Sequence, residues 1–101
     1  MPELVFSKEI TSNSVEYNFT KPISEYDYLL IIATLNEGGG TEHATDVIYR
    51  SLGFDAVYLK TKSYSNNYVN IISVSIRNDN VFLAYSQDTQ AKYLKIYGCK
   101  F

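Results

Sequence analysis

The side chains that could carry out chemistry in this sequence are few, and their spacing suits neither catalysis nor metal binding. The single histidine, His43, has two carboxylates nearby, Glu42 and Asp46, but no second histidine or ligating cysteine accompanies it to complete a zinc site. A general base also needs a partner group, and one unpartnered histidine does not meet that requirement. We therefore expect His43 to be an exposed loop residue, and the sequence predicts no metal site and no cofactor.

The single cysteine and the glycine run are equally weak signals for chemistry. Cys99 cannot form an internal disulfide, and a buried free cysteine behaves as a small hydrophobe. The run Gly38-Gly39-Gly40 is followed by Thr41-Glu42 instead of the Lys-Ser/Thr of a phosphate-binding loop, and a carboxylate would repel phosphate. Because no nucleophile is paired with a base, we expect that the protein is not an enzyme.

A polar loop with two tyrosines is the best candidate for a ligand contact. In the segment SYSNNY, Tyr64 and Tyr68 could stack on sugar rings, while Asn66, Asn67 and the nearby Asn70 supply hydrogen bonds. Binding sites of this kind combine an aromatic platform with a few convergent polar groups. The alternative is that this segment is an ordinary polar loop.

The glycine run is the second candidate contact region. Gly38, Gly39 and Gly40 follow the most apolar segment of the chain, and glycine carries the largest backbone entropy. We therefore expect this segment to be the most mobile internal loop. We expect it to lie, with Asn36 and His43, at an exposed end of the fold and to become ordered only against a partner chain or a ligand.

The composition favours β structure and limits the classes of partner. Val, Ile, Thr, Phe and Tyr account for 38 of the 101 residues, and these side chains pack well on a pleated, half-buried surface. The hydrophobic fraction of 46% excludes an intrinsically disordered chain. A net charge of −2 argues against nucleic acid as a partner. The longest unbroken apolar run, residues 29–33, is too short to span a bilayer, so no membrane insertion is expected.

Short alternating or apolar segments, separated by turns, predict about seven or eight strands. The segment 15–20 alternates cleanly, whereas 26–35 is apolar on both faces and predicts a central strand buried on both sides. The only plausible helix in the first half is a single turn around residues 42–46. The predicted strands are 4–6, 15–20, 26–35, 46–50, 54–60, 68–77, 81–85 and 92–101. We therefore predict a single all-β domain over residues 1–101, an antiparallel β-sandwich, with a small β-barrel as the alternative.

The C-terminal string KYLKIYGCKF carries a resemblance to a known class of module. It resembles the end of small β-rich modules in tailed-bacteriophage and prophage virion proteins, including tail fibres, baseplate-associated proteins and head fibres. Those modules often finish in an aromatic, alternating strand of the form Ile-Tyr-Gly-x-Lys, here Ile96 to Lys100. The apolar segment from Ser24 to Ile31 is similar to a second strand of the same modules.

The resemblance implies a non-enzymatic virion structural protein: a small fibre, decoration or tail-attachment module. Such a protein would be made in the bacterial cytoplasm and located in the phage particle. Its partners would be other virion proteins, and it would be a homo-oligomer, most often a trimer, that buries the apolar outer faces of strands such as 26–35. The alternative is a carbohydrate-binding module at a phage tail tip that contacts host-surface sugars. The family transfers no active site.

Overall fold

The computed structural model describes residues 2–11, 13–34, 43–49, 56–62, 69–86 and 92–101. These residues form eight β-strands and one short 3-10 helix, so the prediction of an all-β fold is confirmed. None of the described residues belongs to a helix long and apolar enough to cross a membrane. The elements are β1 (Glu3–Ile10), β2 (Val15–Asn18), η1 (Ile23–Glu25), β3 (Tyr28–Thr34), β4 (His43–Tyr49), β5 (Ala56–Lys62), β6 (Val69–Ile76), β7 (Val81–Ser86) and β8 (Lys92–Cys99).

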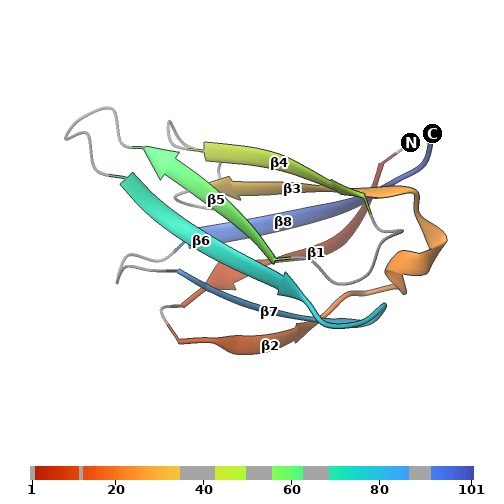
Figure 1. Ribbon diagram of the computed structural model, residues 1–101, viewed down its shortest axis with the longest axis horizontal. Coiled ribbons are helices and arrows are strands. Elements are labelled where there is room, and N and C mark those ends of the chain that lie inside the picture. Colours follow the sequence, from red (N-terminus) through yellow and green to blue (C-terminus); the bar gives the residue numbers. More distant parts are fainter. Residues whose placement is uncertain (1, 12, 35–42, 50–55, 63–68, 87–91) are drawn as a thin grey trace.

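The strands form two antiparallel sheets (Figure 1). One four-stranded sheet has the order β1-β8-β3-β4, and the other has the order β2-β7-β6-β5. Three connections join neighbours within a sheet, from β3 to β4, from β5 to β6 and from β6 to β7. Each of the other connections leads from one sheet to the other. Because β1 and β8 are antiparallel neighbours, the two chain ends lie side by side at one end of the molecule.

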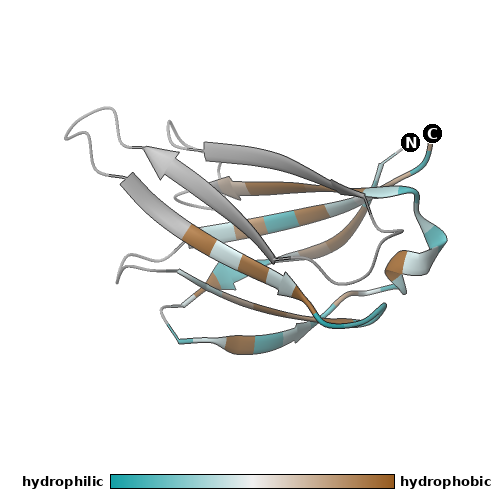
Figure 2. Cartoon of the chain, viewed as in Figure 1, coloured by the Kyte–Doolittle hydropathy of each residue, from teal (hydrophilic) through white to brown (hydrophobic). Residues whose placement is uncertain are grey.

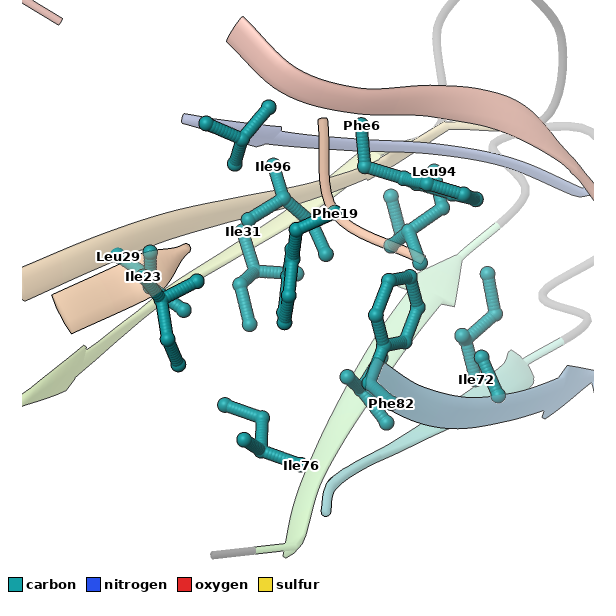
Figure 3. Packing of buried hydrophobic residues seen from close by; sticks show 14 of the residues in the cluster. Phe6, Phe19, Ile23, Leu29, Ile31, Ile72, Ile76, Phe82, Leu94 and Ile96 are labelled. Atoms are coloured by element: carbon teal, nitrogen blue, oxygen red, sulfur yellow. The ribbon is translucent and has the colours of Figure 1, made fainter. Parts of the chain in front are cut away.

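Both sheets contribute alternate residues to one hydrophobic core (Figure 3). On β3, for example, Leu29, Ile31 and Ala33 are buried, which is the period of two expected for a strand with one face in the core. The largest fully buried side chains are Val5, Ile10, Ile23, Leu29, Ile31, Ile72, Val74, Phe82, Leu94 and Ile96.

An aromatic cluster around Phe82 joins the two sheets. The Phe82 ring centroid on β7 lies 4.8 Å from that of Phe6 on β1, 5.6 Å from that of Tyr17 on β2, and 4.7 Å from that of Phe19. Rings that pack edge to face or offset at these distances attract each other, and this attraction adds to the stabilisation gained by burying their surface. Truncating a buried phenylalanine to alanine typically costs about 3–5 kcal/mol, so this cluster is a principal contact between the sheets.

A β-bulge lets two consecutive residues of β1 enter the core. The register shifts between Leu4, opposite Tyr97, and Phe6, opposite Ile96. Val5 and Phe6 are both buried as a result. The Val5 carbonyl accepts a hydrogen bond from the Thr20 backbone N–H at 2.9 Å. The bulge therefore also ties β1 to the segment that follows β2.

The prediction of a helical turn around residues 42–46 is wrong. β4 begins at His43 and pairs with β3 along its whole length, so His43 lies at the start of a strand and not in a loop. Pairing with a neighbouring strand outweighs the weak local preference of these residues. The strand predicted at 54–60 lies slightly later, at Ala56–Lys62.

A different helical turn, which the sequence did not predict, follows Pro22. Residues Ile23–Glu25 form the 3-10 helix η1, which the Tyr26 N–H closes with a 3.1 Å hydrogen bond to the Ile23 carbonyl. One turn of this length carries no hydrophobic period, so a sequence pattern gives little sign of it.

The prediction that 26–35 is buried on both sides is confirmed for one face of β3 and stays a prediction for the other. Leu29, Ile31 and Ala33 are buried, but Leu30 and Ile32 are only half-buried. The first face of β3 meets the core, and no described element covers the second.

Gly98 in β8 lies directly beneath the ring of Tyr26. A Cβ atom at this position would overlap the ring atoms Cγ, Cδ2 and Cε2 of Tyr26, which is itself buried. The glycine in the Ile-Tyr-Gly string is therefore required by close packing of an aromatic ring on the strand backbone. An aromatic side chain that covers a glycine in a sheet in this way restores the packing that the glycine lacks.

We predict that Gly98→Ala lowers the free energy of unfolding by about 1–3 kcal/mol, because the methyl group forces the Tyr26 ring out of its site. Urea unfolding of wild type, Gly98→Ala, Tyr26→Ala and the double variant measures this effect. The cost of Gly98→Ala should become much smaller when Tyr26 is already alanine. Fully additive costs would contradict the close-packing interpretation.

Candidate functional site

Most of the contact residues predicted from the sequence lie outside the described residues. This applies to the glycine run with its neighbour Asn36 and to the SYSNNY loop, and hence to Gly38, Gly39, Gly40, Tyr64, Asn66, Asn67 and Tyr68. Asn70 belongs to β6, where its backbone pairs with Thr61 of β5. The carbohydrate-contact hypothesis for these loops therefore remains a prediction.

The outer surface of the sheet β1-β8-β3-β4 is the first candidate site within the described residues. We call it the tyrosine face and define it by Leu4, Tyr28, Leu30, Ile32, Tyr93, Lys95 and Tyr97. These side chains alternate with core residues along their strands, and all are half-buried except Leu4, which is 46% exposed. Figure 2 shows the alternation along β8 and the hydrophobic character of β3 beside it.

Strand register brings the tyrosine face into one continuous surface. Tyr97 lies between Leu4 of β1 and Leu30 of β3, and two residues earlier Lys95 lies between Ser7 and Ile32. Cross-strand neighbours on one face of a sheet are close enough for their side chains to touch. The apolar side chains of three strands therefore adjoin one another.

Two polar contacts hold Tyr93 in place on this surface. The Ser7 hydroxyl donates a 2.9 Å hydrogen bond to the Tyr93 hydroxyl oxygen. The Lys95 Nζ lies 6.0 Å from the centroid of the Tyr93 ring, at the outer limit of a cation–π contact. Tyr93 thus presents an oriented ring with a charged neighbour.

The outer surface of the opposite sheet is more polar. Along β7, Leu83 and Tyr85 are half-buried, but their cross-strand neighbours on β6 are Ser75 and Ser73. On the other side, Leu83 has the exposed Glu16 of β2 as its neighbour. The tyrosine face is therefore the more apolar of the two outer surfaces in the described residues.

The second candidate is a charged cluster where the two chain ends meet. The Tyr26 hydroxyl donates a hydrogen bond to Glu3 Oε1, and Lys21 Nζ lies 2.9 Å from Glu3 Oε2. Glu3 is opposite Gly98, the residue beneath the Tyr26 ring. These groups line a shallow pocket of about 390 Å³ whose walls are Pro2, Glu3, Lys21, Glu25, Tyr26 and Lys100.

The electrostatics of this cluster favour fixed protonation states. The hydrogen bonds from Tyr26 and then Lys21 lower the pKa of Glu3, because both donors favour the carboxylate. Burial, followed by the hydrogen bond to Glu3, raises the pKa of Tyr26 to about 12. The bond to Glu3 also raises the pKa of Lys21. These three groups therefore do not change charge near neutral pH, which suits a structural role better than proton transfer.

Two further candidates for chemistry in the described residues are metal-binding side chains and the cysteine Cys99. Within the described ranges, no three His, Cys, Asp or Glu side chains are grouped closely enough to hold a metal ion. Cys99 is buried at the end of β8, with its Sγ 3.9 Å from the Tyr97 carbonyl oxygen. The small-hydrophobe interpretation of Cys99 fits this position.

No protein-family model, no curated protein and no solved structure matches this chain. The function must therefore be argued from the two surfaces described above.

Sequence reasoning pointed to the outer face of strand 26–35 as a contact with other chains, and this face supplies Leu30 and Ile32 of the tyrosine face. It did not single out the rest of that surface or the charged cluster. The alternation of Tyr93, Lys95 and Tyr97 in the last strand contains a signal for the tyrosine face, because it places three large side chains on the solvent side. No such signal exists for Glu3, Lys21 and Tyr26, since only the folded chain brings them together.

We predict that Glu3→Gln destabilises the protein at neutral pH and that this difference disappears in acid. A lowered folded-state pKa stabilises the fold above the unfolded value of 4.5, and the stabilisation is lost as the pH falls through the folded-state pKa. Urea midpoints of wild type and Glu3→Gln should therefore converge below pH 4.5. Glu9→Gln, which changes an exposed carboxylate of the same strand, is the control. A difference that is constant with pH would contradict the role of Glu3.

We predict the opposite pH window for Tyr26→Phe. A raised folded-state pKa stabilises the fold fully below the unfolded value of 10.0, and this stabilisation is lost as the pH rises toward the folded value of about 12. The unfolding free energies of wild type and Tyr26→Phe should differ at neutral pH and approach each other between those two values. Tyr85→Phe, at a half-buried position on β7, serves as the control. If the difference in unfolding free energy between wild type and Tyr26→Phe widens with rising pH, Tyr26 does not donate to Glu3 in the folded protein.

Proposed function

We propose that this chain is a non-enzymatic structural module of a tailed-bacteriophage virion, which attaches to other virion proteins through its tyrosine face. The fold we propose for it is an antiparallel β-sandwich, supported by a core to which both sheets contribute. The virion assignment is supported by the resemblance of the last strand, and the mode of attachment by the tyrosine face.

The proposed attachment rests on the residue types that make up the tyrosine face. Protein interfaces are enriched in tyrosine at their centres, and tyrosine is among the residues that most often dominate binding energy. Tyr93 and Tyr97 lie on one strand of this face, with Leu30 and Ile32 on the next. Covering these half-buried side chains would remove apolar area from water, at roughly 25 cal/mol per Å².

The edge strand β1 is poorly suited to attachment by strand addition. Its bulge interrupts the regular ladder, and Thr20 already occupies the Val5 carbonyl. Lys8 and Glu9 are both exposed on this strand. Bulges and charges are common protections of sheet edges, so the sheet surface is the better contact.

A carbohydrate-binding role is the second candidate, and one observation favours it. Tyr93 and Tyr97 are half-buried on one strand, and Lys95 lies between them in the sequence with its Nζ 6.0 Å from the centroid of the Tyr93 ring. The two rings and the ammonium could contact a sugar. Binding on a glycan array that is lost in Tyr97→Ala would support this role, and loss in Tyr64→Ala and Tyr68→Ala would place the site in the loop predicted from the sequence.

The proposed function predicts that the chain is a component of phage particles. Particles should be induced from the strain that encodes the chain and purified on a density gradient, and their proteins should be identified by peptide mass spectrometry. The chain should co-purify with the particles, and Leu30→Ser with Tyr97→Ser should greatly reduce its incorporation.

The matched control changes the other outer surface. Leu83→Ser with Tyr85→Ser removes the same side-chain types from β7 and should leave incorporation unchanged. Absence of the wild-type chain from every particle fraction would overturn the virion assignment, and equal loss in both double variants would overturn the role of the tyrosine face.

A further inference from the structure

One end of the tyrosine face carries an exposed aromatic ring. Phe101 is 88% exposed, and Leu4, on the neighbouring strand β1, is the next most exposed large hydrophobic side chain among the described residues. Tyr28 is the cross-strand partner of Cys99, so Phe101 follows the end of β8 beside Tyr28. We call Leu4, Tyr28, Tyr97 and Phe101 the aromatic corner.

Two contacts hold the exposed ring in place. The backbone N–H of Phe101 donates a 2.8 Å hydrogen bond to Asp27 Oδ2. The Phe101 ring centroid lies 5.5 Å from that of Tyr28, with an interplanar angle of 40°. Asp27 is itself tied to β8, because its own N–H donates to the Cys99 carbonyl. The Phe101 ring therefore has a defined position although little of it is covered.

The aromatic corner adjoins the apolar centre of the tyrosine face. Tyr97 is opposite Leu4 on one side and Leu30 on the other. Tyr28 lies two residues before Leu30 on β3 and is a diagonal neighbour of Tyr97. Single exposed hydrophobic side chains are ordinary on protein surfaces, whereas contiguous ones mark contacts with other molecules. Continuity with the tyrosine face therefore favours a contact role for Phe101.

The chemistry of the ring restricts what can cover it. Phenylalanine has no hydrogen-bond donor or acceptor, so polar groups that faced the buried ring would be left without partners. The recess that receives the ring must therefore be apolar. A side chain that already has its bound position loses little entropy on binding, and buried aromatic side chains commonly dominate binding energy.

We infer that Phe101 is the anchor of the proposed attachment and inserts into an apolar pocket of a neighbouring virion protein, with Leu4 and Tyr97 packed around it. This inference rests on the proposed function and names the residue and the kind of pocket that meet. Asp27 is a positioning residue, because it acts through the backbone of Phe101.

Competition for places in the particle tests the anchor. The wild-type chain and one variant are produced together in the induced strain, and peptide mass spectrometry compares their ratio in purified particles with their ratio in the cell. Phe101→Ala should be depleted about tenfold to a hundredfold, the effect of burying one phenylalanine side chain. Its urea midpoint should stay close to that of wild type, because the ring is mostly exposed in the isolated chain.

Two variants of Asp27 separate its positioning role from its charge. Both Asp27→Ala and Asp27→Asn remove the carboxylate, but the asparagine carbonyl oxygen can still accept the Phe101 N–H. Asp27→Ala should be depleted about threefold to tenfold, the cost of ordering one side chain on binding, whereas Asp27→Asn should be incorporated like wild type. The control is Val15→Ala, which shortens an exposed hydrophobic side chain of β2 and should leave the ratio unchanged.

The outcomes separate this inference from the proposed function. If wild type is found in particles and Phe101→Ala is not depleted, or if the urea midpoint of Phe101→Ala falls strongly, the anchor role is overturned and the virion assignment stands. If Phe101→Ala is retained in particles but loses binding on a glycan array, the occupant is a sugar and the inference is again wrong. Equal depletion of the two Asp27 variants would overturn the positioning role. Absence of wild type from every particle fraction would overturn both the inference and the proposed function.

Discussion

Between β2 and β3 the chain crosses from one sheet to the other, and the ring of Tyr26 fixes this crossing by lying on the backbone of Gly98. Backbone hydrogen bonds hold the same segment on three sides. Phe19 and Ile23 donate to Asn80 and Asp79 in the turn between β6 and β7, and Thr20 donates to Val5. At the end of the crossing, the Asp27 N–H donates to the Cys99 carbonyl at 2.8 Å.

This crossing links the core to the chain ends. Phe19 and Ile23 fill the core from within the segment, beside Phe82 and Leu29 (Figure 3). The Tyr26 hydroxyl and Lys21 reach outward from it to Glu3, the first residue of β1. Correct pairing of β1 with β8, and hence the position of the β1 residues on the tyrosine face, therefore depends on how this segment packs.

The elements that sequence reasoning predicted well are those with a clean local period. The segments 81–85 and 92–101 are predicted as strands, and they correspond to β7 (Val81–Ser86) and β8 (Lys92–Cys99). The apolar run of β3 predicts burial on both faces, and within the chain only the face of Leu29, Ile31 and Ala33 lies in the core. A sequence cannot distinguish a side chain covered by another layer from one left at the surface. The packing of Tyr26 on Gly98 was invisible, since these residues are far apart in the chain and neither carries a pattern that points to the other.

The side-by-side position of the chain ends has a mechanical consequence. β1 and β8 are antiparallel, and Glu3 and Gly98 face each other at the end where both termini emerge. A force that pulls the two ends apart would load the β1–β8 hydrogen bonds one pair after another, as in opening a zipper, and not all together. The first groups to bear that load would be Glu3, Lys21 and Tyr26, so the contacts among them would have to break before the strands separate.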